Sequence, residues 1–171
     1  GLTHFEGKTR ATLKIQDGCG MYCTYCIIPY ARNRIASMPM DTIIAAVKEL
    51  CEEGYHEAVL TGIHLASYRD AENHRLIDVL QHINEETPIE RLRLGSLEPK
   101  LLTEQFLSQL STIKCFCPHF HFSLQSGSNE ILKKMNRRYT AEEYFAITEN
   151  VRKFFPDAMI TTDVIVGFPG E

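Results

Sequence analysis

The chain has 171 residues, of which 44% are hydrophobic and 23% charged, and its net charge is −4 at pH 7. This composition excludes a disordered chain, because disordered chains lack the apolar side chains that build a core. Proteins that bind nucleic acid over much of their surface are usually basic, whereas this chain is slightly acidic. Any contact with RNA must therefore come from a local patch of positive charge.

No apolar run reaches the roughly 20 residues needed to cross a bilayer, and residues 1–10 do not look like a signal peptide. We therefore expect no membrane contact and a cytoplasmic location, where thiols stay reduced. Six cysteines are too few for a disulfide scaffold, and three of them cluster between positions 19 and 26. In a reducing compartment, clustered thiols indicate metal or redox chemistry.

Strands and helices alternate along the predicted structure. Alternating or continuous apolar side chains predict strands over residues 11–16, 57–61, 90–94, 119–124 and 159–166. Apolar side chains at helical spacing predict helices over residues 39–53, 76–87, 103–110 and from 140 onward. The last helix begins with a capping box, Thr140 and Glu143. Strands that alternate with helices predict a parallel β/α fold.

The number of predicted strands limits the architecture. A closed barrel of eight β/α units needs about 250 residues, whereas this chain has five predicted strands and stops directly after the fifth. We expect an open, partial β/α barrel cut from a longer protein, with residues 1–8 as a linker and 9–171 as the core domain. A doubly wound sheet of five strands is the alternative, which periodicity alone does not exclude.

The strongest chemical signal is Cys19, Cys23 and Cys26, spaced C-x3-C-x2-C in the loop after the first strand. Three thiolates on one short loop can hold three corners of a cubic iron–sulfur cluster, which leaves the fourth iron free to bind a ligand. Structural zinc sites use four closed ligands, and no fourth Cys or His follows at the usual spacing. A disulfide with one spare thiol is the third reading, and a reducing compartment opposes it.

Tyr25, directly before the last cysteine of the triplet, extends the pattern. Further blocks follow in order over nearly the whole chain: CIIPYAR at 26–32, LTGIHL at 60–65, RLRLGSLEP at 91–99, LQSGS at 124–128, MNRRY at 135–139 and DVIVGFPGE at 163–171. Together they resemble the radical S-adenosylmethionine (SAM) methylthiotransferase family. The resemblance is closest to the branch that methylthiolates carbon 2 of N6-threonylcarbamoyladenosine at position 37 of tRNA.

This resemblance implies a set of cofactors and residues that bind them. Cys19, Cys23 and Cys26 would hold a 4Fe-4S cluster, whose open iron chelates SAM for reductive cleavage to a 5′-deoxyadenosyl radical. Gln125 ends the fourth predicted strand, where β/α active sites lie, and is assigned to the SAM ribose. The remaining residues expected to bind the cofactor are Tyr25, Thr61, Gly62, Ser96, Arg137, Ile165 and Val166.

The cofactor residues have stated roles and simpler alternatives. Arg137 would pair with the SAM carboxylate. Backbone groups at Thr61 and Gly62 would meet the SAM amino group, although Gly62 also suits an ordinary turn. Ile165 and Val166 would contact the adenine, and core packing is their alternative. Ser96 would face the methionine part of SAM or the substrate.

The substrate residues follow the same reasoning. Arg32 and Arg34 would meet tRNA phosphates, although Asn33 and Ala36 stand where the family usually has Gly and Arg. Glu98 would face the SAM methionine or the substrate. His64 would contact the substrate or be an ordinary loop residue.

The fourth predicted strand has an unusual polar face. His119, His121 and Ser123 alternate with apolar side chains. Barrel interiors are normally filled by branched apolar residues, so this polar face suits a lumen that holds a polar cofactor. Hydrogen-bonded packing of the two histidines is the simpler reading, and we prefer it to a metal site.

The resemblance also implies parts that these residues do not contain. Full-length family members carry an amino-terminal domain with a second 4Fe-4S cluster and a carboxyl-terminal RNA-binding domain. We expect tRNA and an electron donor as partners, and a chain that binds a cluster and SAM but does not complete methylthiolation alone. The alternative substrates are isopentenyl-adenosine tRNA or a ribosomal-protein aspartate. The alternative without enzyme activity is a zinc-stapled binding module.

Overall fold

A computed structural model describes residues 9–32 and 34–171 of the chain. The linker predicted at residues 1–8, and Asn33, lie outside the described residues. Within these ranges, no helix is long and apolar enough to cross a membrane.

The first sheet has four strands in the order β2-β1-β3-β4. These strands are β1 (Ala11–Asp17), β2 (Ala36–Ser37), β3 (Glu57–Gly62) and β4 (Arg91–Leu94). β1, β3 and β4 run parallel, whereas β2 pairs antiparallel with β1. Alternate side chains such as Ile15, Leu60 and Leu92 are fully buried, which explains why these short apolar runs form strands.

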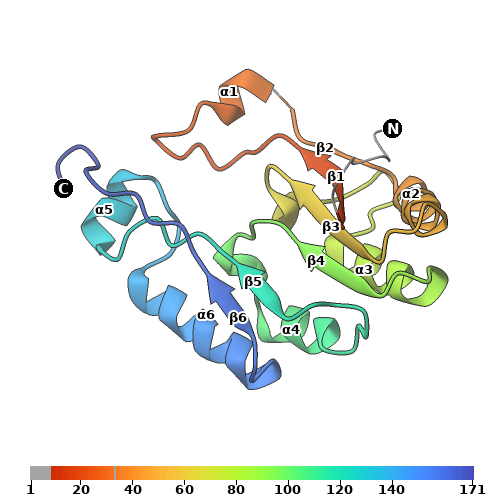
Figure 1. Ribbon diagram of the computed structural model, residues 1–171. Helices are drawn as coiled ribbons and strands as arrows, with labels where there is room; N and C mark the ends of the chain where they lie inside the picture. The colour runs from red at the N-terminus through yellow and green to blue at the C-terminus, as the bar shows by residue number, and fades with distance from the viewer. Residues whose placement is uncertain (1–8, 33) are drawn as a thin grey trace.

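A second sheet, of two parallel strands, lies next to β4 and extends the series of strands. It pairs β5 (His119–His121) with β6 (Met159–Thr161). Backbone hydrogen bonds from Leu92 to Cys115 and from Leu97 to His121 join β4 to the β5 segment without forming a continuous ladder. The described strands therefore form a curved row that does not close, as the expected partial barrel requires (Figure 1).

Four helices, the shortest of which has 7 residues, cover one side of this row (Figure 1). They are α2 (Met40–Glu52), α3 (Leu76–Glu86), α4 (Glu104–Leu110) and α6 (Ala141–Phe154). Each packs on the next in the order α2, α3, α4, α6. A doubly wound sheet would have helices on both faces, so the partial barrel is confirmed and the doubly wound alternative is wrong.

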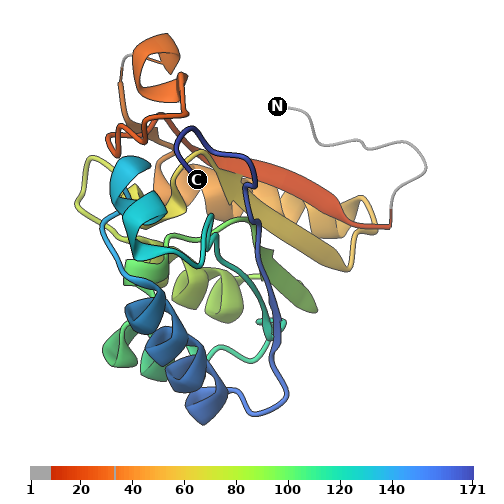
Figure 2. The same cartoon turned by 90° about the vertical axis from the view of Figure 1, so that its left-hand side faces the viewer.

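The shorter helices lie in the loops that follow strands or precede the next helix. They are α1 (Ile28–Arg32), η1 (Leu65–Ser67), η2 (Pro99–Leu101) and α5 (Asn129–Lys134). After β6, the chain continues beyond the end of the strand and passes α5 (Figures 1 and 2). There Lys134 Nζ donates to the Gly170 carbonyl at 2.9 Å. The carboxyl ends of the strands are thus surrounded by short elements and loops.

The last two strands are shorter than the predicted ranges 119–124 and 159–166. The side chain of Thr162 enters the ladder: its Oγ1 donates to the Phe122 carbonyl at 2.9 Å and accepts from the Leu124 amide at 2.8 Å. A hydroxyl therefore replaces the backbone groups that would continue the pairing. Val166, at the end of the predicted range, lies outside β6 and is 82% exposed.

The predicted start of the α6 helix is confirmed. Thr140 Oγ1 accepts from the Glu143 amide at 3.1 Å, and Glu143 Oε2 accepts from the Thr140 amide at 2.9 Å. Two amides that have no partner within the helix are satisfied in this way. The helix then packs Tyr144 and Val151 into the core.

Asp70 organises the loop between η1 and α3. Its side chain is 4% exposed and accepts from the backbone amides of Met40, Glu72 and His74, and from His74 Nδ1 at 2.9 Å. Burial alone would raise the pKa of Asp70, but the hydrogen bonds from His74 lower it below the ordinary value. The same hydrogen bond raises the pKa of His74.

These shifts predict how stability depends on pH. The contribution of Asp70 is present above the unfolded pKa of about 4 and is lost as the pH falls through its lowered pKa. The contribution of His74 is present below about pH 6.5 and is lost as the pH rises through its raised pKa. We expect Asp70→Ala to lower the free energy of unfolding by about 2 kcal/mol near pH 5.5. Urea unfolding across pH tests this, and an equal loss at pH 3 would contradict it.

Candidate functional site

A cavity of about 350 Å³ opens between the cysteine loop and the loops that follow β3, β4 and β5. These loops leave the carboxyl ends of parallel strands, where β/α proteins place their active sites. The side chains that line the cavity come from distant parts of the sequence: Cys19, Met21, Cys23, Tyr25, Cys26, Ile28, Gly62, Ile63, His64, Ser96, Leu97, Glu98, Ser123, Gln125 and Arg137.

Most of the residues expected from the sequence meet in this cavity. The three cysteines lie with Tyr25, Gly62, His64, Ser96, Glu98, Gln125 and Arg137. Five others do not line it. Thr61 turns its hydroxyl to the Leu13 carbonyl at 3.4 Å, and Val166 is largely exposed. Ile165 donates its amide to Gln125, while the exposed Arg32 and Arg34 lie beyond the cysteine loop.

The cysteine loop is held in place by the end of α5. Asn136 Nδ2 donates to the carbonyls of Met21 and Tyr22, at 3.3 and 2.9 Å. The Thr24 amide and hydroxyl donate to the carbonyls of Met135 and Lys134, at 3.2 and 2.9 Å. Sequence reasoning missed Thr24 and Asn136 as positioning residues. The signal was the MNRRY block, in which only Arg137 received a role.

The three sulfurs face the cavity in partly buried surroundings. Cys23 is buried, and its Sγ accepts from Arg137 Nη1 at 3.4 Å. Cys19 Sγ accepts from the Met21 amide at 3.4 Å, and burial raises the pKa of the Cys19 thiol. Nitrogen donors of this kind tune the sulfurs of iron–sulfur sites.

The arrangement of the cysteines bears on which metal group they fit. In residues 9–32 and 34–171, no three Cys, His, Asp or Glu side chains converge as ligands of one metal ion. In a four-iron cube each cysteine binds a different iron, so the sulfurs surround a volume rather than a point. Three cysteines that line one cavity supply ligands for three irons of such a cube, whereas a structural zinc site uses four closed ligands.

Glu98 and Arg137 form an ion pair beside the cysteines. Arg137 Nη2 lies 2.9 Å from Glu98 Oε2, and both side chains are 8% exposed. Arg137 Nε also donates to the hydroxyl of Tyr139 at 3.0 Å. Burial alone would lower the pKa of Arg137, but the carboxylate of Glu98 raises it above its ordinary value, so the guanidinium stays charged.

Polar atoms without partners point to a missing ligand. Both ring nitrogens of His64 and Oε1 of Glu98 are buried with no hydrogen-bond partner among the described residues. Such atoms are costly to bury unless something binds them. Burial, followed by the charge of Arg137, lowers the pKa of His64 and favours the neutral ring. His64 and Glu98 both line the cavity, so a polar ligand bound there would be placed to form the hydrogen bonds that these atoms lack. SAM is a polar ligand of this kind.

Hydroxyl and amide groups also line the cavity. The Ser96 and Ser123 hydroxyls lie 3.3 Å apart. Gln125 adopts a positive φ of 68°, which is uncommon for a residue with a side chain and clusters at functional sites. Its backbone is fixed by hydrogen bonds to Asp163 and Ile165, at 2.9 and 2.8 Å. The ladder to the β6 segment thus imposes this conformation at the cavity wall.

The polar face predicted on the fourth strand has partners within the protein. His121 Nδ1 lies 2.9 Å from Thr161 Oγ1, and His121 Nε2 lies 3.2 Å from Asp163 Oδ2. His119 Nε2 lies 3.3 Å from the same Thr161 hydroxyl. The preferred reading of hydrogen-bonded packing is confirmed for both histidines, and only Ser123 reaches the cavity.

Gly62 is required by close packing at the end of β3. A Cβ atom there would lie 2.9 Å from both Cβ and Oε1 of Gln16, a buried residue. Gln16 Oε1 accepts from the His64 amide at 2.7 Å, and its Nε2 donates to the Gly18 carbonyl at 2.8 Å. Gln16 thereby ties the β3 loop to the start of the cysteine loop.

Gly62→Ala should therefore disturb both loops. We expect the free energy of unfolding to fall by about 1–3 kcal/mol, as for other overpacked sites. The control is Gly127→Ala, since a Cβ at Gly127 would meet nothing within 4 Å. Urea unfolding of both variants checks the prediction, and equal stability of the two would refute it.

The chain is similar to curated tRNA-modifying enzymes. It is 43% identical over 167 residues to "Threonylcarbamoyladenosine tRNA methylthiotransferase MtaB" of Chlamydia pneumoniae, covering 98% of this chain and 39% of that protein. It is 43% identical over 168 residues to "tRNA-2-methylthio-N(6)-dimethylallyladenosine synthase" of Thermoanaerobacter sp., covering 97% and 36%. The chain thus spans well under half the length of these relatives.

Solved structures share the fold at low identity. The cobalamin-dependent SAM radical enzyme OxsB superposes with a TM-score of 0.70 at 12% identity, over 90% of this chain and 23% of that one. The radical SAM methyltransferase TsrM from Kitasatospora setae gives 0.66 at 20% identity, over 90% and 30%. Residues 13–171 also match the sequence profile of the Radical SAM superfamily. With its cysteine loop at the carboxyl ends of an open β/α row, the chain belongs to the radical SAM superfamily.

Proposed function

We propose that this chain is the radical-generating core of a tRNA methylthiotransferase. Its reaction would insert a methylthio group at carbon 2 of N6-threonylcarbamoyladenosine at position 37 of tRNA. The observation that carries the proposal is one cavity in which three cysteines meet buried, unpartnered polar atoms of His64 and Glu98. The radical SAM family implies a 4Fe-4S cluster and SAM, and this cavity has the donors for both.

The proposed roles follow from the positions of the side chains. Cys19, Cys23 and Cys26 would hold the cluster, and its fourth iron would bind SAM. The cluster, when bound, supplies the electron that cleaves SAM. Glu98 Oε1 would accept a hydrogen bond from the amino group of SAM or from the substrate, while Arg137 holds the carboxylate in place. Among the residues that line the cavity, Arg137 is the one with a permanent positive charge, so it would pair with the SAM carboxylate.

Other residues of the lining would orient the rest of the cofactor. Gln125 is assigned to the ribose, and Ser96 and Tyr25 to contacts at the rim of the cavity. Thr61, Ile165 and Val166 do not line the cavity. Any contact that they make with the cofactor would have to come through the backbone or after a rearrangement.

The choice of substrate rests on the relatives. Proteins named for threonylcarbamoyladenosine and for dimethylallyladenosine reach the same 43% identity. We favour the former because the segments around Gly62 and Ser96 resemble that branch. In the whole protein, a second 4Fe-4S cluster outside these residues would supply sulfur, and an electron donor would reduce the first cluster. Arg32 and Arg34, both exposed, would contact phosphates of the tRNA.

Anaerobic reconstitution followed by SAM and a strong reductant tests the core activity. We expect about four irons per chain and release of 5′-deoxyadenosine; one zinc per chain without colour would refute the proposal. The substrate is tested with the whole protein and two tRNAs, carrying either threonylcarbamoyl- or dimethylallyl-adenosine. Mass spectrometry should find the methylthio group on the former, and its appearance only on the latter would overturn this assignment.

A further inference from the structure

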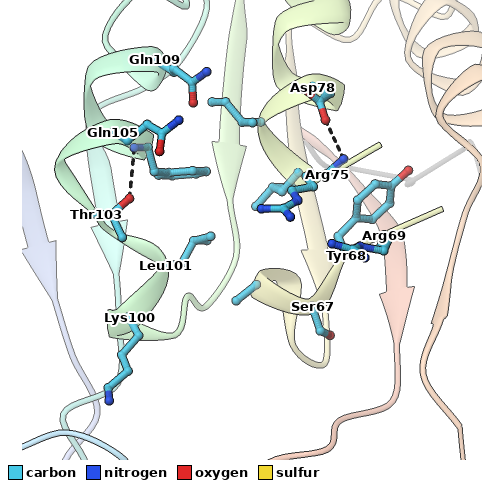
Figure 3. Close-up of a pocket in the computed structure, with 14 residues that line it drawn as sticks. Ser67, Tyr68, Arg69, Arg75, Asp78, Lys100, Leu101, Thr103, Gln105 and Gln109 are labelled. Carbon is cyan, nitrogen blue, oxygen red and sulfur yellow. Dashed lines mark hydrogen bonds between the residues drawn. The ribbon is translucent and has the colours of Figure 1, made fainter. Parts of the chain in front are cut away.

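A second cavity, of about 570 Å³, adjoins the same two loops that line the first. It lies between α3 and α4 and is bounded by η1 and η2 (Figure 3). η1 begins directly after His64, and η2 directly after Glu98. The loops that carry these two side chains into the first cavity therefore continue into the walls of the second. Because these loops follow β3 and β4, the walls that they form lie toward the carboxyl ends of these strands.

The second cavity is rich in unpaired positive charge. Arg69, Arg75 and Lys100 line it, all three are exposed, and none has an ion-pair partner in the described part of the chain. Asp78, the acidic residue of the lining, already accepts from the Arg75 backbone amide at 2.7 Å. This hydrogen bond does not cancel the charge of Asp78, so the cleft holds three cations and one carboxylate. In a chain with a net charge of −4, this excess of cations forms a local positive patch of the kind that binds an anion.

Amide side chains complete this lining. Gln105 and Gln109 on α4 face Arg75 across the gap, and Lys100 lies at one end of it (Figure 3). Guanidinium groups donate in a planar fork that matches phosphate oxygens. Amides and lysine add donors of the type that contact phosphate and sugar in nucleic acids. The lining thus carries several donors of the type that bind an anionic, oxygen-rich ligand.

We propose that this cleft binds phosphodiester groups of the RNA strand whose reacting nucleoside enters the first cavity. The inference rests on the proposed function, because it takes RNA as the substrate. Continuity through the two shared loops favours a polymer over a small free anion: a strand with one nucleoside beside His64 and Glu98 reaches the cleft with its neighbouring phosphates. Contacts of this kind fix the register of the strand and carry no sequence information.

The test is a triple variant that removes the three positive charges: Arg69→Gln, Arg75→Gln and Lys100→Gln. The matched control is Lys48→Gln, Lys114→Gln and Arg152→Gln, which removes the same charge at exposed positions outside both cavities. An unmodified RNA stem-loop with an adenosine-rich loop is the probe. Its dissociation constant is measured by fluorescence anisotropy over a series of salt concentrations, for the wild-type chain and both variants.

We expect the cleft variant to bind the RNA at least about tenfold more weakly. The slope of log affinity against log salt should fall by about 2, because three phosphate contacts in a single strand are lost. The control variant should keep the wild-type slope. Equal losses in both variants, an unchanged slope in the cleft variant, or no RNA binding by the wild-type chain would overturn the proposal.

A separate measurement keeps this inference distinct from the proposed function. Release of 5′-deoxyadenosine from SAM without RNA should be unchanged in the cleft variant, because none of its three residues lines the first cavity. Failure of the wild-type chain to cleave SAM would contradict the proposed function, independently of the result of the RNA-binding measurements. Loss of SAM cleavage in the cleft variant alone would overturn the assignment of this cleft to RNA.

Discussion

Cys23→Ser is expected to remove the iron–sulfur cluster and with it all cleavage of SAM. Cys23 is the most buried of the three clustered cysteines, and Arg137 donates to its sulfur. A serine hydroxyl remains protonated where a thiolate binds iron, so one corner of the cube loses its ligand. After anaerobic reconstitution, iron should fall from about four per chain to below about one, and 5′-deoxyadenosine should be undetectable.

Cys51→Ser is the matched control for this prediction. Cys51 lies half-buried on α2 and does not line the cavity. The control should keep its iron and its activity, and circular dichroism should find both variants folded. Full iron content in Cys23→Ser would contradict the assignment of this residue as a ligand, whatever the level of activity.

The second large effect concerns the buried pair of Glu98 and Arg137. Arg137→Met leaves a carboxylate that is 8% exposed without its cation. Removing one partner of a buried ion pair costs about 3–5 kcal/mol, because the remaining charge has lost its solvation and gained nothing in return. Urea unfolding should therefore find this variant much less stable. Arg138→Met, a change at the exposed neighbouring residue, should lie within about 0.5 kcal/mol of the wild type.

The double variant Arg137→Met with Glu98→Gln separates stability from function. A neutral pair leaves no buried charge, so stability should recover most of the loss. Binding of SAM, measured by calorimetry on the reconstituted chain, should stay weak if Glu98 and Arg137 contact the cofactor. Recovery of binding together with stability would show that the pair is only structural. A loss below about 1 kcal/mol in Arg137→Met would contradict the pairing itself.

Local patterns in the sequence were enough to predict the β/α order and the cysteine triplet. The helix predicted over 39–53 forms as α2, because Ile43, Val47 and Leu50 recur on one face and are buried together. The capping box at Thr140 and Glu143 also depends on neighbours within one turn. Such features are fixed by side chains a few residues apart, which a reader of the sequence sees directly.

The site depends on contacts that local patterns do not contain. Arg137 contacts Glu98, more than 30 residues away in the sequence, and Cys23, more than 100 residues away. Asn136 contacts Met21 and Tyr22, also more than 100 residues away. The resemblance to a family assigned Arg137 to a cofactor, whereas the folded chain also gives it an internal partner.

The sequence by itself determined the alternation of strands and helices, the cysteine loop and the polar residues Ser123 and Gln125, whereas the choice of a partial barrel over a doubly wound sheet came from the structure. Only the tertiary structure decided that Gln16 packs on Gly62, that Thr162 shortens the last two strands, and that Arg69, Arg75 and Lys100 share one cleft. Periodicity reports which face of an element is apolar. It does not report which distant side chains meet, because those contacts depend on how the curved row of strands brings its loops together.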